Sequence, residues 1–310
     1  MHQNLVSIVI PAYHADRLLE ETLESIECQT HSNWELLVTE DASHDETENL
    51  VSEFAARNPT HRVVFTRHEV NAGPSASRNT GIELARGDFI ALLDADDLWM
   101  PDHLRVSVEA LCDTNADITY STTLMFDDET RALTGIWGPN ATECSEFPNG
   151  LYKRCFVVPS STVIKSSVFT QVGFFDTDPA IQGCEDIDFW LRCVKSGCNF
   201  HHITGLHCLY RKGHEEAATS RMGKLLPRQA TVLESHFGMP QILPSVQRQG
   251  LAHYSLLAAI AQLKQSPLAA IKSFLRAWRL RPLWLPLSAS MRLAAACFRS
   301  FKSVVARVRP

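Results

Sequence analysis

Short, uninterrupted apolar runs alternate with segments of helical spacing through the first half of this chain, and this alternation constrains the fold strongly. The apolar runs are Val6–Ile10, Trp34–Thr39, Val63–Thr66 and Phe89–Leu93. Such runs are typical of strands that are buried on both faces of a sheet. The intervals between them have helical spacing: Asp16–Cys28, Asp45–Arg57 and Pro74–Arg86. Strand–helix–strand repetition predicts an α/β fold with a mostly parallel, Rossmann-like sheet flanked by helices.

Charge divides the chain into two unequal parts. Residues 241–310 contain 11 Lys or Arg and no Asp or Glu, a net charge of +11, whereas residues 1–240 carry a net charge of −17. We therefore expect an α/β domain over residues 1–240 and a basic, helical C-terminal region over residues 241–310. The expected helices of the second part are Gly250–Gln265, Pro267–Leu280 and Leu287–Arg307.

Cysteine usage and hydropathy indicate the compartment. The nine cysteines are odd in number and form no CxxC pair, which favours reduced thiols in the cytoplasm over a disulfide framework. The apolar stretch Val6–Ile10 is too short for a signal peptide, and no apolar run reaches the length of a membrane span. We expect a cytoplasmic protein, with peripheral attachment to the inner face of the membrane as an alternative.

Polar residues follow three of the expected strands directly. They form the clusters Pro11–Tyr13, Glu40–Ser43 and Asp94–Asp97. In a parallel sheet the carboxyl ends of the strands share one edge, and ligands bind there. The three clusters are therefore expected to form one site.

The cluster Asp94-Ala95-Asp96-Asp97 places three carboxylates within four residues. These charges repel one another, and a hard divalent cation such as Mn²⁺ or Mg²⁺, shared with substrate phosphates, would relieve the repulsion. For an isolated Asp-x-Asp, a solvated loop or a helix cap is the commoner interpretation. The apolar strand that precedes this cluster directs it to the sheet edge, which favours the cation.

Two other loops have the chemistry to bind a nucleotide. Asp41 can accept a hydrogen bond from the imide N–H of a base, and Ser43 can bind a phosphate, although each residue can also cap a helix. The segment Asn71–Asn79 begins a helix with a glycine and several small residues, and a helix N-terminus attracts anions. Arg78 in this segment can reach a diphosphate or a ribose, or it can form a surface ion pair.

A further pair of carboxylates, Glu185 and Asp186, opens the expected helix Asp186–Ser196 after a glycine-containing loop. A carboxylate at a helix N-terminus is usually a cap or a partner of the helix dipole. The same position can hold a general base over a cleft. The cysteines and histidines between Cys193 and Cys208 fit no common ligand spacing, so zinc is not expected.

The ordered set of these motifs resembles the family 2 glycosyltransferases, which have the GT-A fold. The resemblance runs from Ser7 to Arg211, roughly two-thirds of the chain. Its segments are Ser7–Tyr13, Glu40–Ser43, Asn71–Asn79, Ala85–Ile90, Leu93–Trp99, Gly173–Asp176 and Glu185–Trp190. Each motif is weak alone, and their common order and spacing are specific.

The resemblance implies which residues hold the nucleotide sugar. Pro11, Tyr13 and Asp41 would bind the nucleotide base, with Arg78 nearby. Ser43 belongs to the same binding loop.

The resemblance also implies the metal ligands and the base. Asp94 would contact the ribose or the cation, Asp96 would bind the cation and the diphosphate, and Asp186 would be the general base beside Glu185. His214 lies in a segment similar to the family's Tyr-Arg-x-His loop, but this chain has one extra residue there, which makes His214 the weakest of the expected metal ligands.

The expected reaction is an inverting, direct displacement. A sugar would pass from a nucleotide-diphosphate donor, in the first place a UDP-sugar, to a hydroxyl of a glycan or lipid-linked acceptor in cell-envelope polysaccharide biosynthesis. Burial and the neighbouring Glu185 should raise the pKa of Asp186 above about 3.9. A nucleotidyltransferase is an alternative, although no glycine-rich loop with a lysine follows the first strand. A non-catalytic sugar-nucleotide-binding module would not need Asp186.

The basic region admits two main interpretations. Its aromatic and aliphatic residues, among them Trp278 and Trp284, suit helices that lie on an anionic membrane surface. A helical cap on the acidic domain would use the same charge. No motif supports nucleic acid as a partner.

Overall fold

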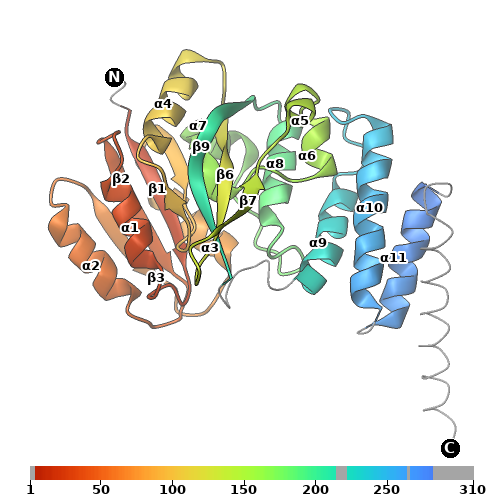
Figure 1. The fold of residues 1–310 in the computed structure, drawn as a ribbon, viewed down its shortest axis with the longest axis horizontal. Helices are drawn as coiled ribbons and strands as arrows, with labels where there is room; N and C mark the ends of the chain where they lie inside the picture. The colour runs from red at the N-terminus through yellow and green to blue at the C-terminus, as the bar shows by residue number, and fades with distance from the viewer. Residues whose placement is uncertain (1–3, 214–221, 264–265, 282–310) are drawn as a thin grey trace, which may run out of the picture.

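The computed structural model describes residues 4–213, 222–263 and 266–281 (Figure 1). Within these residues the chain forms one mixed sheet in the order β3-β2-β1-β4-β8-β6-β9-β5, with β7 paired to β6. The strands are β1 (Val6–Ala12), β2 (Trp34–Glu40), β3 (Val63–Arg67), β4 (Phe89–Leu92), β5 (Leu98–Trp99), β6 (Ile118–Asp127), β7 (Leu133–Trp137), β8 (Thr162–Lys165) and β9 (Phe200–Lys212). The expected α/β fold with a mostly parallel sheet is confirmed.

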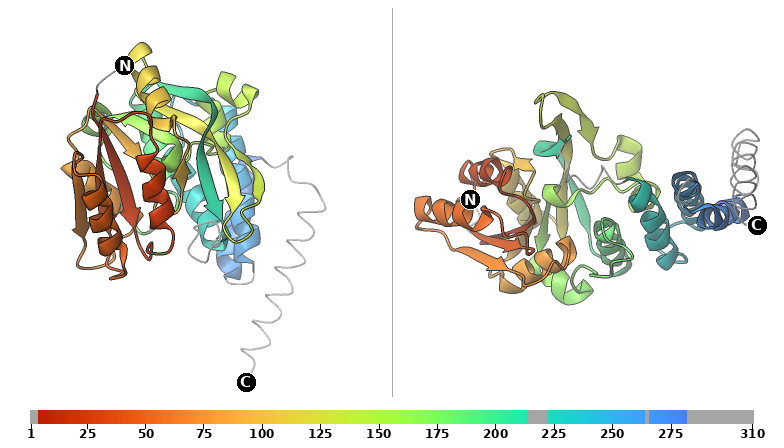
Figure 2. Two further views of the ribbon diagram at one scale, coloured as in Figure 1. Left: turned by 60° about the vertical axis from the view of Figure 1, so that its left-hand side comes forward. Right: turned by 90° about the horizontal axis from the view of Figure 1, so that it is seen from below.

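Helices cover both faces of this sheet, and the last three extend beyond one end of it (Figure 2). They are α1 (Leu19–Glu27), α2 (Thr47–Arg57), α3 (Pro74–Leu84), α4 (His103–Asp113), α5 (Ala141–Ser145), α6 (Asn149–Lys153), α7 (Ser166–Val172), α8 (Glu185–Lys195), α9 (Met222–Ser235), α10 (Pro244–Gln262) and α11 (Pro267–Leu280). A 3₁₀ turn, η1 (Pro159–Ser161), precedes β8.

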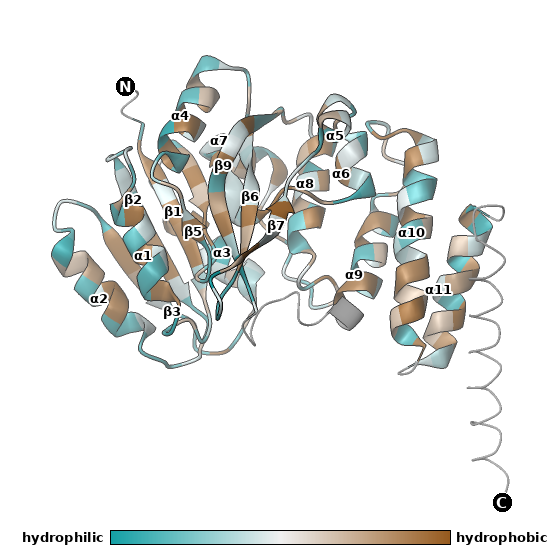
Figure 3. Cartoon of the chain, viewed as in Figure 1, coloured by the Kyte–Doolittle hydropathy of each residue, from teal (hydrophilic) through white to brown (hydrophobic). Residues whose placement is uncertain are grey.

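The four expected strands of the N-terminal half pair in parallel as β3-β2-β1-β4. Ala12 lies opposite Glu40, and Val9 lies opposite Leu92. The carboxyl ends of β1, β2 and β4 therefore meet at one edge, and the three polar clusters come together there as expected. The strands are mainly apolar, whereas the surrounding helices alternate between apolar and polar residues (Figure 3).

Two apolar clusters fill the two faces of the sheet. One contains Ile8, Leu23, Phe54 and Leu104, among others, and packs α1, α2 and α4 against the sheet. The other is built around the fully buried Trp190 of α8 and extends into the C-terminal helices.

The first part of the basic region shares this second core. Ile242, Val246 and Leu251 pack in the same cluster as Trp190, so α10 rests directly on the α/β domain. The domain boundary at residue 240 and the function of the tail stay predictions. No helix within the described ranges is long and apolar enough to cross a membrane. The expected helix Leu287–Arg307 falls outside those ranges.

The N-cap of α2 is Glu46, so Ser43 does not cap this helix. Asp45 accepts a hydrogen bond from the backbone N–H of Thr47, and the Ser43 hydroxyl turns back to Glu40. A short Asx turn therefore precedes the helix.

Candidate functional site

The ends of β1 and β2 form the first wall of the site. Pro11 pairs in register with Thr39 inside the sheet, and Tyr13 follows it with 49% of its surface exposed. Ser43 donates to Glu40 at 2.5 Å, and Glu40 is held in turn by Arg67 at 2.7 Å. An exposed aromatic ring beside two sheet ends is a suitable surface for a planar base to stack upon.

Asp41 is almost completely buried and already has three donors. Its Oδ1 accepts from the backbone N–H of Ala72 at 2.9 Å and lies 2.8 Å from Nδ1 of His68, while its Oδ2 accepts from the N–H of Gly73 at 2.7 Å. An ionised carboxylate has about four acceptor positions. Asp41 therefore fixes the loop before α3, and among the described residues no second donor reaches its Oδ2.

Arg78 connects the acidic cluster to the start of α8. Its Nη2 donates to Asp94 at 2.6 Å, and its Nη1 donates to Glu185 at 3.1 Å. The guanidinium also stacks over the ring of Phe175, 5.7 Å from its centre. Arg78 is buried, so this is no surface ion pair: two carboxylates from distant parts of the sequence compensate its charge.

The members of the Asp94–Asp97 cluster have different environments. Burial and the neighbouring Asp96 raise the pKa of Asp94, and Arg78 opposes this change. Asp97 is fully buried, accepts from the hydroxyl of Ser160 at 2.5 Å, and has a pKa well above its usual range because of burial and the other two carboxylates. Asp94 and Asp96 are thus the partly accessible members, and Asp97 holds the loop from inside.

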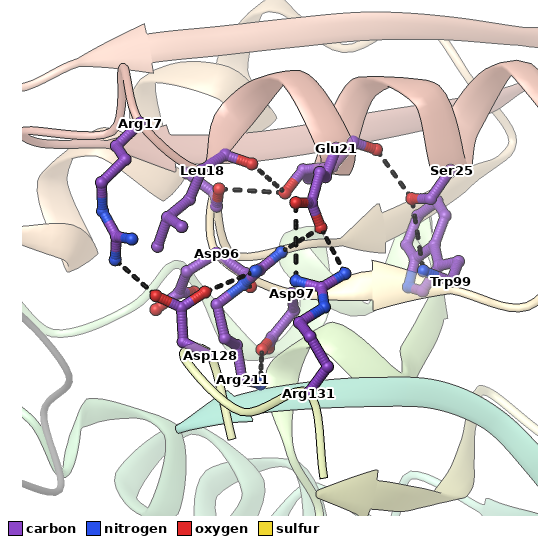
Figure 4. Close-up of polar contacts among 12 residues, drawn as sticks. Arg17, Leu18, Glu21, Ser25, Asp96, Asp97, Trp99, Asp128, Arg131 and Arg211 are labelled. Carbon is purple, nitrogen blue, oxygen red and sulfur yellow. Dashed lines mark hydrogen bonds and ion pairs between the residues drawn. The ribbon is translucent and has the colours of Figure 1, made fainter. Parts of the chain in front are cut away.

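The main chain of this cluster is bound to the end of β9. The backbone N–H of Arg211 donates to Asp97 at 3.1 Å, and Nε of Arg211 donates to the carbonyl oxygen of Asp96 at 2.8 Å (Figure 4). The preceding residue, Tyr210, lies close enough that the charges of Asp97 and Asp96 add to burial in raising the pKa of its phenol. Tyr210 is part of the motif seen in the sequence but was not among the expected site residues.

Asp186 is the second residue of α8 and lies near Arg78 and the acidic cluster. Its pKa is raised to about 7, first by burial and then by the charge of Glu185, as expected from the sequence. Arg78 lowers this pKa and Asp94 raises it, so Asp186 shares its electrostatic environment with the acidic cluster. Glu185 itself is paired with Arg78 and with the N–H of Gly183. A carboxyl that titrates near neutral pH is suited to accept a proton.

A pocket of about 220 Å³ lies at the start of α3, and none of Asp94, Asp96 and Asp186 lines it. Its lining combines the loop at the start of α3 with the segment before α8: Asn71, Ala72, Gly73, Pro74, Ser75, Thr177, Asp178, Pro179 and Gln182. The second half of this lining was not expected, because no periodicity marks residues 177–182. The sequence signal for this segment is Gly183, which directly follows it and adopts a positive φ of +84° in a turn.

A family model described as glycosyl transferase family 2 matches residues 7–173. The chain belongs to glycosyl transferase family 2. It is a glycosyltransferase, and its expected family is confirmed.

Proteins from other bacteria are similar to this chain over about three quarters of its length. The uncharacterised protein y4gI of Sinorhizobium fredii is 32% identical over 238 residues, which cover 75% of this chain but only 25% of y4gI. The UDP-Glc:α-D-GlcNAc-diphosphoundecaprenol β-1,3-glucosyltransferase WfgD of Escherichia coli is 29% identical over 234 residues, covering 75% of this chain and 87% of WfgD.

Solved structures confirm the GT-A type of fold. TarS 1–349 of Staphylococcus aureus, determined in complex with UDP-GlcNAc, has a TM-score of 0.65 and 16% identity, covering 88% of this chain and 79% of that one. The mannosyltransferase PcManGT of Pyrobaculum calidifontis, determined with GDP-Man and Mn²⁺, has a TM-score of 0.62 and 17% identity, covering 97% and 81%. At these identities the likeness concerns the fold.

The described residues of this family 2 enzyme hold no cluster of three or more His, Cys, Asp or Glu arranged for a metal ion. Asp94 and Asp96 supply two carboxylates whose negative charges repel each other, since the charge of Asp96 adds to burial in raising the pKa of Asp94. A cation bound by both would relieve this repulsion. This donor set fits a hard cation whose remaining ligands are phosphate oxygens and water. The third expected ligand, His214, lies outside the described residues.

Proposed function

We propose that this family 2 enzyme transfers a sugar, with inversion, from a UDP-sugar to a hydroxyl of a glycan or lipid-linked acceptor. The observation that carries the proposal is the Asp186 carboxyl, whose pKa is about 7 and which shares its surroundings with Asp94 and Arg78. A base for the acceptor and an acidic, cation-binding loop for the donor thus lie together, as a direct displacement requires.

The donor would lie along the ends of β1, β2 and β4. Oδ2 of Asp41 suits the imide N–H of uracil, and Tyr13 suits stacking of the base. Asp94 and Asp96 would hold Mn²⁺ or Mg²⁺, which would neutralise charge on the leaving diphosphate. Support for UDP comes from WfgD, which is named for its UDP-Glc donor, and from TarS, which was solved with UDP-GlcNAc.

The acceptor would approach from α8. Asp186 accepts the proton of the acceptor hydroxyl as that oxygen attacks the anomeric carbon. Arg78 keeps Glu185 and Asp94 in place on either side, so the charge of Glu185 stays near Asp186 and keeps its pKa high. Support for a lipid-linked acceptor comes from WfgD, whose acceptor is a diphosphoundecaprenol-linked GlcNAc.

The test is transfer from UDP-glucose to GlcNAc-diphosphoundecaprenol in the presence of Mn²⁺, followed by a panel of other UDP-sugars. Asp186→Asn keeps the side-chain shape and removes the proton acceptor, so transfer should fall by about 10²-fold or more while the affinity for UDP stays the same. Asp113→Asn, an exposed change at the end of α4, is the matched control and should transfer like wild type.

Two outcomes would contradict this proposal. Equal transfer by Asp186→Asn and wild type would remove Asp186 from the mechanism. Release of pyrophosphate from a nucleoside triphosphate, without release of UDP from any UDP-sugar, would favour the nucleotidyltransferase instead.

We also propose that the enzyme works in the cytoplasm at the inner face of the membrane. Along α11 the side chains of Leu268, Ile271, Leu275 and Trp278 are exposed, and they recur at helical spacing on one face. Residues 241–310 contain no acidic residue. An apolar helix face in a wholly basic region suits the interface of an anionic membrane.

A further inference from the structure

Arg211, the penultimate residue of β9, is among the largest fully buried side chains of the described chain. A guanidinium that has left water must have its charge and its N–H groups compensated inside the protein. The partners that compensate Arg211 come from three separate elements, and they determine what this residue does.

The first partner is the acidic loop. Nε of Arg211 donates to the carbonyl oxygen of Asp96, and the backbone N–H of Arg211 donates to the carboxylate of Asp97. One residue of β9 therefore binds two consecutive residues of the loop, one through its main chain and one through its side chain (Figure 4).

The other two partners anchor the guanidinium from the opposite side. Nη1 donates to Asp128 at 2.7 Å, just after β6, and Nη2 donates to Glu21 of α1 at 3.0 Å. The guanidinium also lies over the ring of Phe126, 4.9 Å from its centre. Each nitrogen of the planar group thus has a partner, and the plane cannot rotate without losing at least one of them.

Two exposed arginines share the anchors Asp128 and Glu21 with Arg211. Arg17 pairs with Asp128 at 2.6 Å, and Arg131 pairs with Glu21 at 2.8 Å. Two carboxylates, Asp128 and Glu21, therefore face three guanidinium groups. Because only Arg211 among the three reaches the backbone of Asp96, Arg17 and Arg131 are natural controls for it.

We propose that Arg211 is a positioning residue that fixes the main chain of Asp96, so that its carboxylate meets a divalent cation bound to the donor diphosphate. This inference rests on the proposed function and deepens it. The contacts that carry it are those of Arg211 with Asp96, Asp128 and Glu21. Arg211 does not itself touch the donor, since its guanidinium is buried and all three nitrogens are occupied.

The test measures Mn²⁺ binding to the full chain by electron paramagnetic resonance, with and without UDP, together with thermal unfolding. Lysine keeps the charge but has a single nitrogen, which cannot reach Asp96, Asp128 and Glu21 together. Arg211→Lys should therefore weaken Mn²⁺ binding in the presence of UDP by about 10-fold or more. Arg17→Ala and Arg131→Ala should stay within about two-fold of wild type, because exposed ion pairs contribute little.

The outcomes separate the inference from the proposed function. Wild-type affinity for Mn²⁺ in folded Arg211→Lys would overturn the role of Arg211 and leave the proposed function standing. Absence of UDP-dependent Mn²⁺ binding in the wild type would overturn both. If Arg211→Lys does not fold, Asp128→Asn removes one charged anchor at constant shape. We expect it to weaken Mn²⁺ binding by about three-fold or more, and wild-type affinity there would overturn the inference.

Discussion

At the scale of single residues, two adjacent carboxylates of α8 have opposite environments. Glu185 is paired with Arg78 and a backbone N–H, whereas Oδ1 of Asp186 accepts a hydrogen bond from the N–H of Ile187 at 2.8 Å. The less compensated group has its pKa raised to about 7 by burial and by the charge of its neighbour. A carboxyl whose pKa lies near neutral pH is suited to general acid–base catalysis.

This pKa predicts the pH dependence of transfer. A general base acts in its ionised form, so kcat/KM should rise with pH up to about 7, roughly tenfold per pH unit in the acidic range, and then level off. The measurement is kcat/KM for the donor between pH 5 and 9 at saturating Mn²⁺. In Asp186→Asn the residual rate should lose this inflection. An unchanged inflection in the variant would assign it to another group.

The same pKa has a consequence for stability that needs no substrate. Asp186 keeps a proton in the folded state up to about pH 7, but a free aspartate releases it near 3.8. The folded state therefore binds more protons between these values, and the free energy of unfolding contributed by Asp186 falls as pH rises through them. Urea unfolding should show Asp186→Asn gaining stability relative to wild type from pH 4 to pH 7. A difference that is constant with pH would contradict the raised pKa.

Sequence motifs could identify the carboxylates of the site, but they could not show which carboxylates stabilise the loops and which can contact a ligand. Asp97 belongs to the acidic cluster, yet it is bound by Ser160 and Arg211, which lie 63 and 114 positions away in the sequence. Asp41 was expected to face a ligand, and most of its acceptor capacity is used by Ala72, Gly73 and His68. Contacts over such separations leave no periodic pattern in a single sequence.

At the scale of elements, α3 joins the nucleotide side of the site to the catalytic side. Its first turn is bound by Asp41 through Gly73, its middle carries Arg78, and Asn79 exchanges two hydrogen bonds with the backbone of Phe175. The helix lies unusually close to β1, because a Cβ on Gly81 would come within 2.7 Å of a methyl carbon of Val9. The position of α3 therefore depends on that glycine.

Gly81→Ala should move α3 away from β1. Val9 is a fully buried, β-branched residue with little freedom to move, so the added methyl group should cost about 1–3 kcal/mol in the free energy of unfolding. Urea denaturation is the measurement, and UDP binding should weaken with it. Glu83→Ala, an exposed change in the same helix, is the control and should stay within about 0.5 kcal/mol. A stabilised Gly81→Ala, as helix propensity alone would give, would contradict this packing.

The alternation of apolar runs and helices predicted the N-terminal half of the fold well. All four expected strands and the three helices between them are present, and their ends differ by a few residues from those expected. The expected burial on both faces is wrong for β3, which lies at the edge of the sheet and is only partly buried. The second half was predicted less completely. β9 runs from Phe200 to Lys212 and pairs with β6 from end to end, with two register shifts, although many of its residues are polar. β7 is exposed along its length and was missed, since an exposed strand needs no apolar alternation.

At the scale of the molecule, the described C-terminal helices pack against the α/β domain on one side and expose apolar side chains on another. α10 completes the core of the α/β domain, and Arg276 of α11 pairs with Glu234 of α9 at 2.9 Å. The opposite face of α11 is apolar and exposed, with Leu268 at 77% and Trp278 at 50% exposure. The sequence left two alternatives for this region, a helical cap on the acidic domain and a membrane-binding surface. Under our proposal, different faces of the same region would perform these two roles.

Flotation with liposomes that contain anionic lipid tests the membrane face. The double variant Leu268→Ser/Trp278→Ser should lose most of the bound fraction seen with wild type at low salt, because it removes apolar area from the face that would enter the interface. Val70→Ser, which changes an exposed apolar residue in the loop after β3, is the control and should float like wild type. If the double variant floats as well as wild type, α11 is not the docking surface.

The two cores of the sheet also differ in when they can be completed as the chain is synthesised. The cluster around Ile8 and Phe54 draws on residues up to Cys208, whereas the cluster around Trp190 needs Leu251 of α10. Domains fold from the N-terminus as the chain leaves the ribosome. One face of the sheet can therefore close while the sides of α6 and α9 that α10 covers still face water. Until α10 emerges, apolar residues of this second cluster, such as Leu151 of α6 and Leu233 of α9, lack part of their cover.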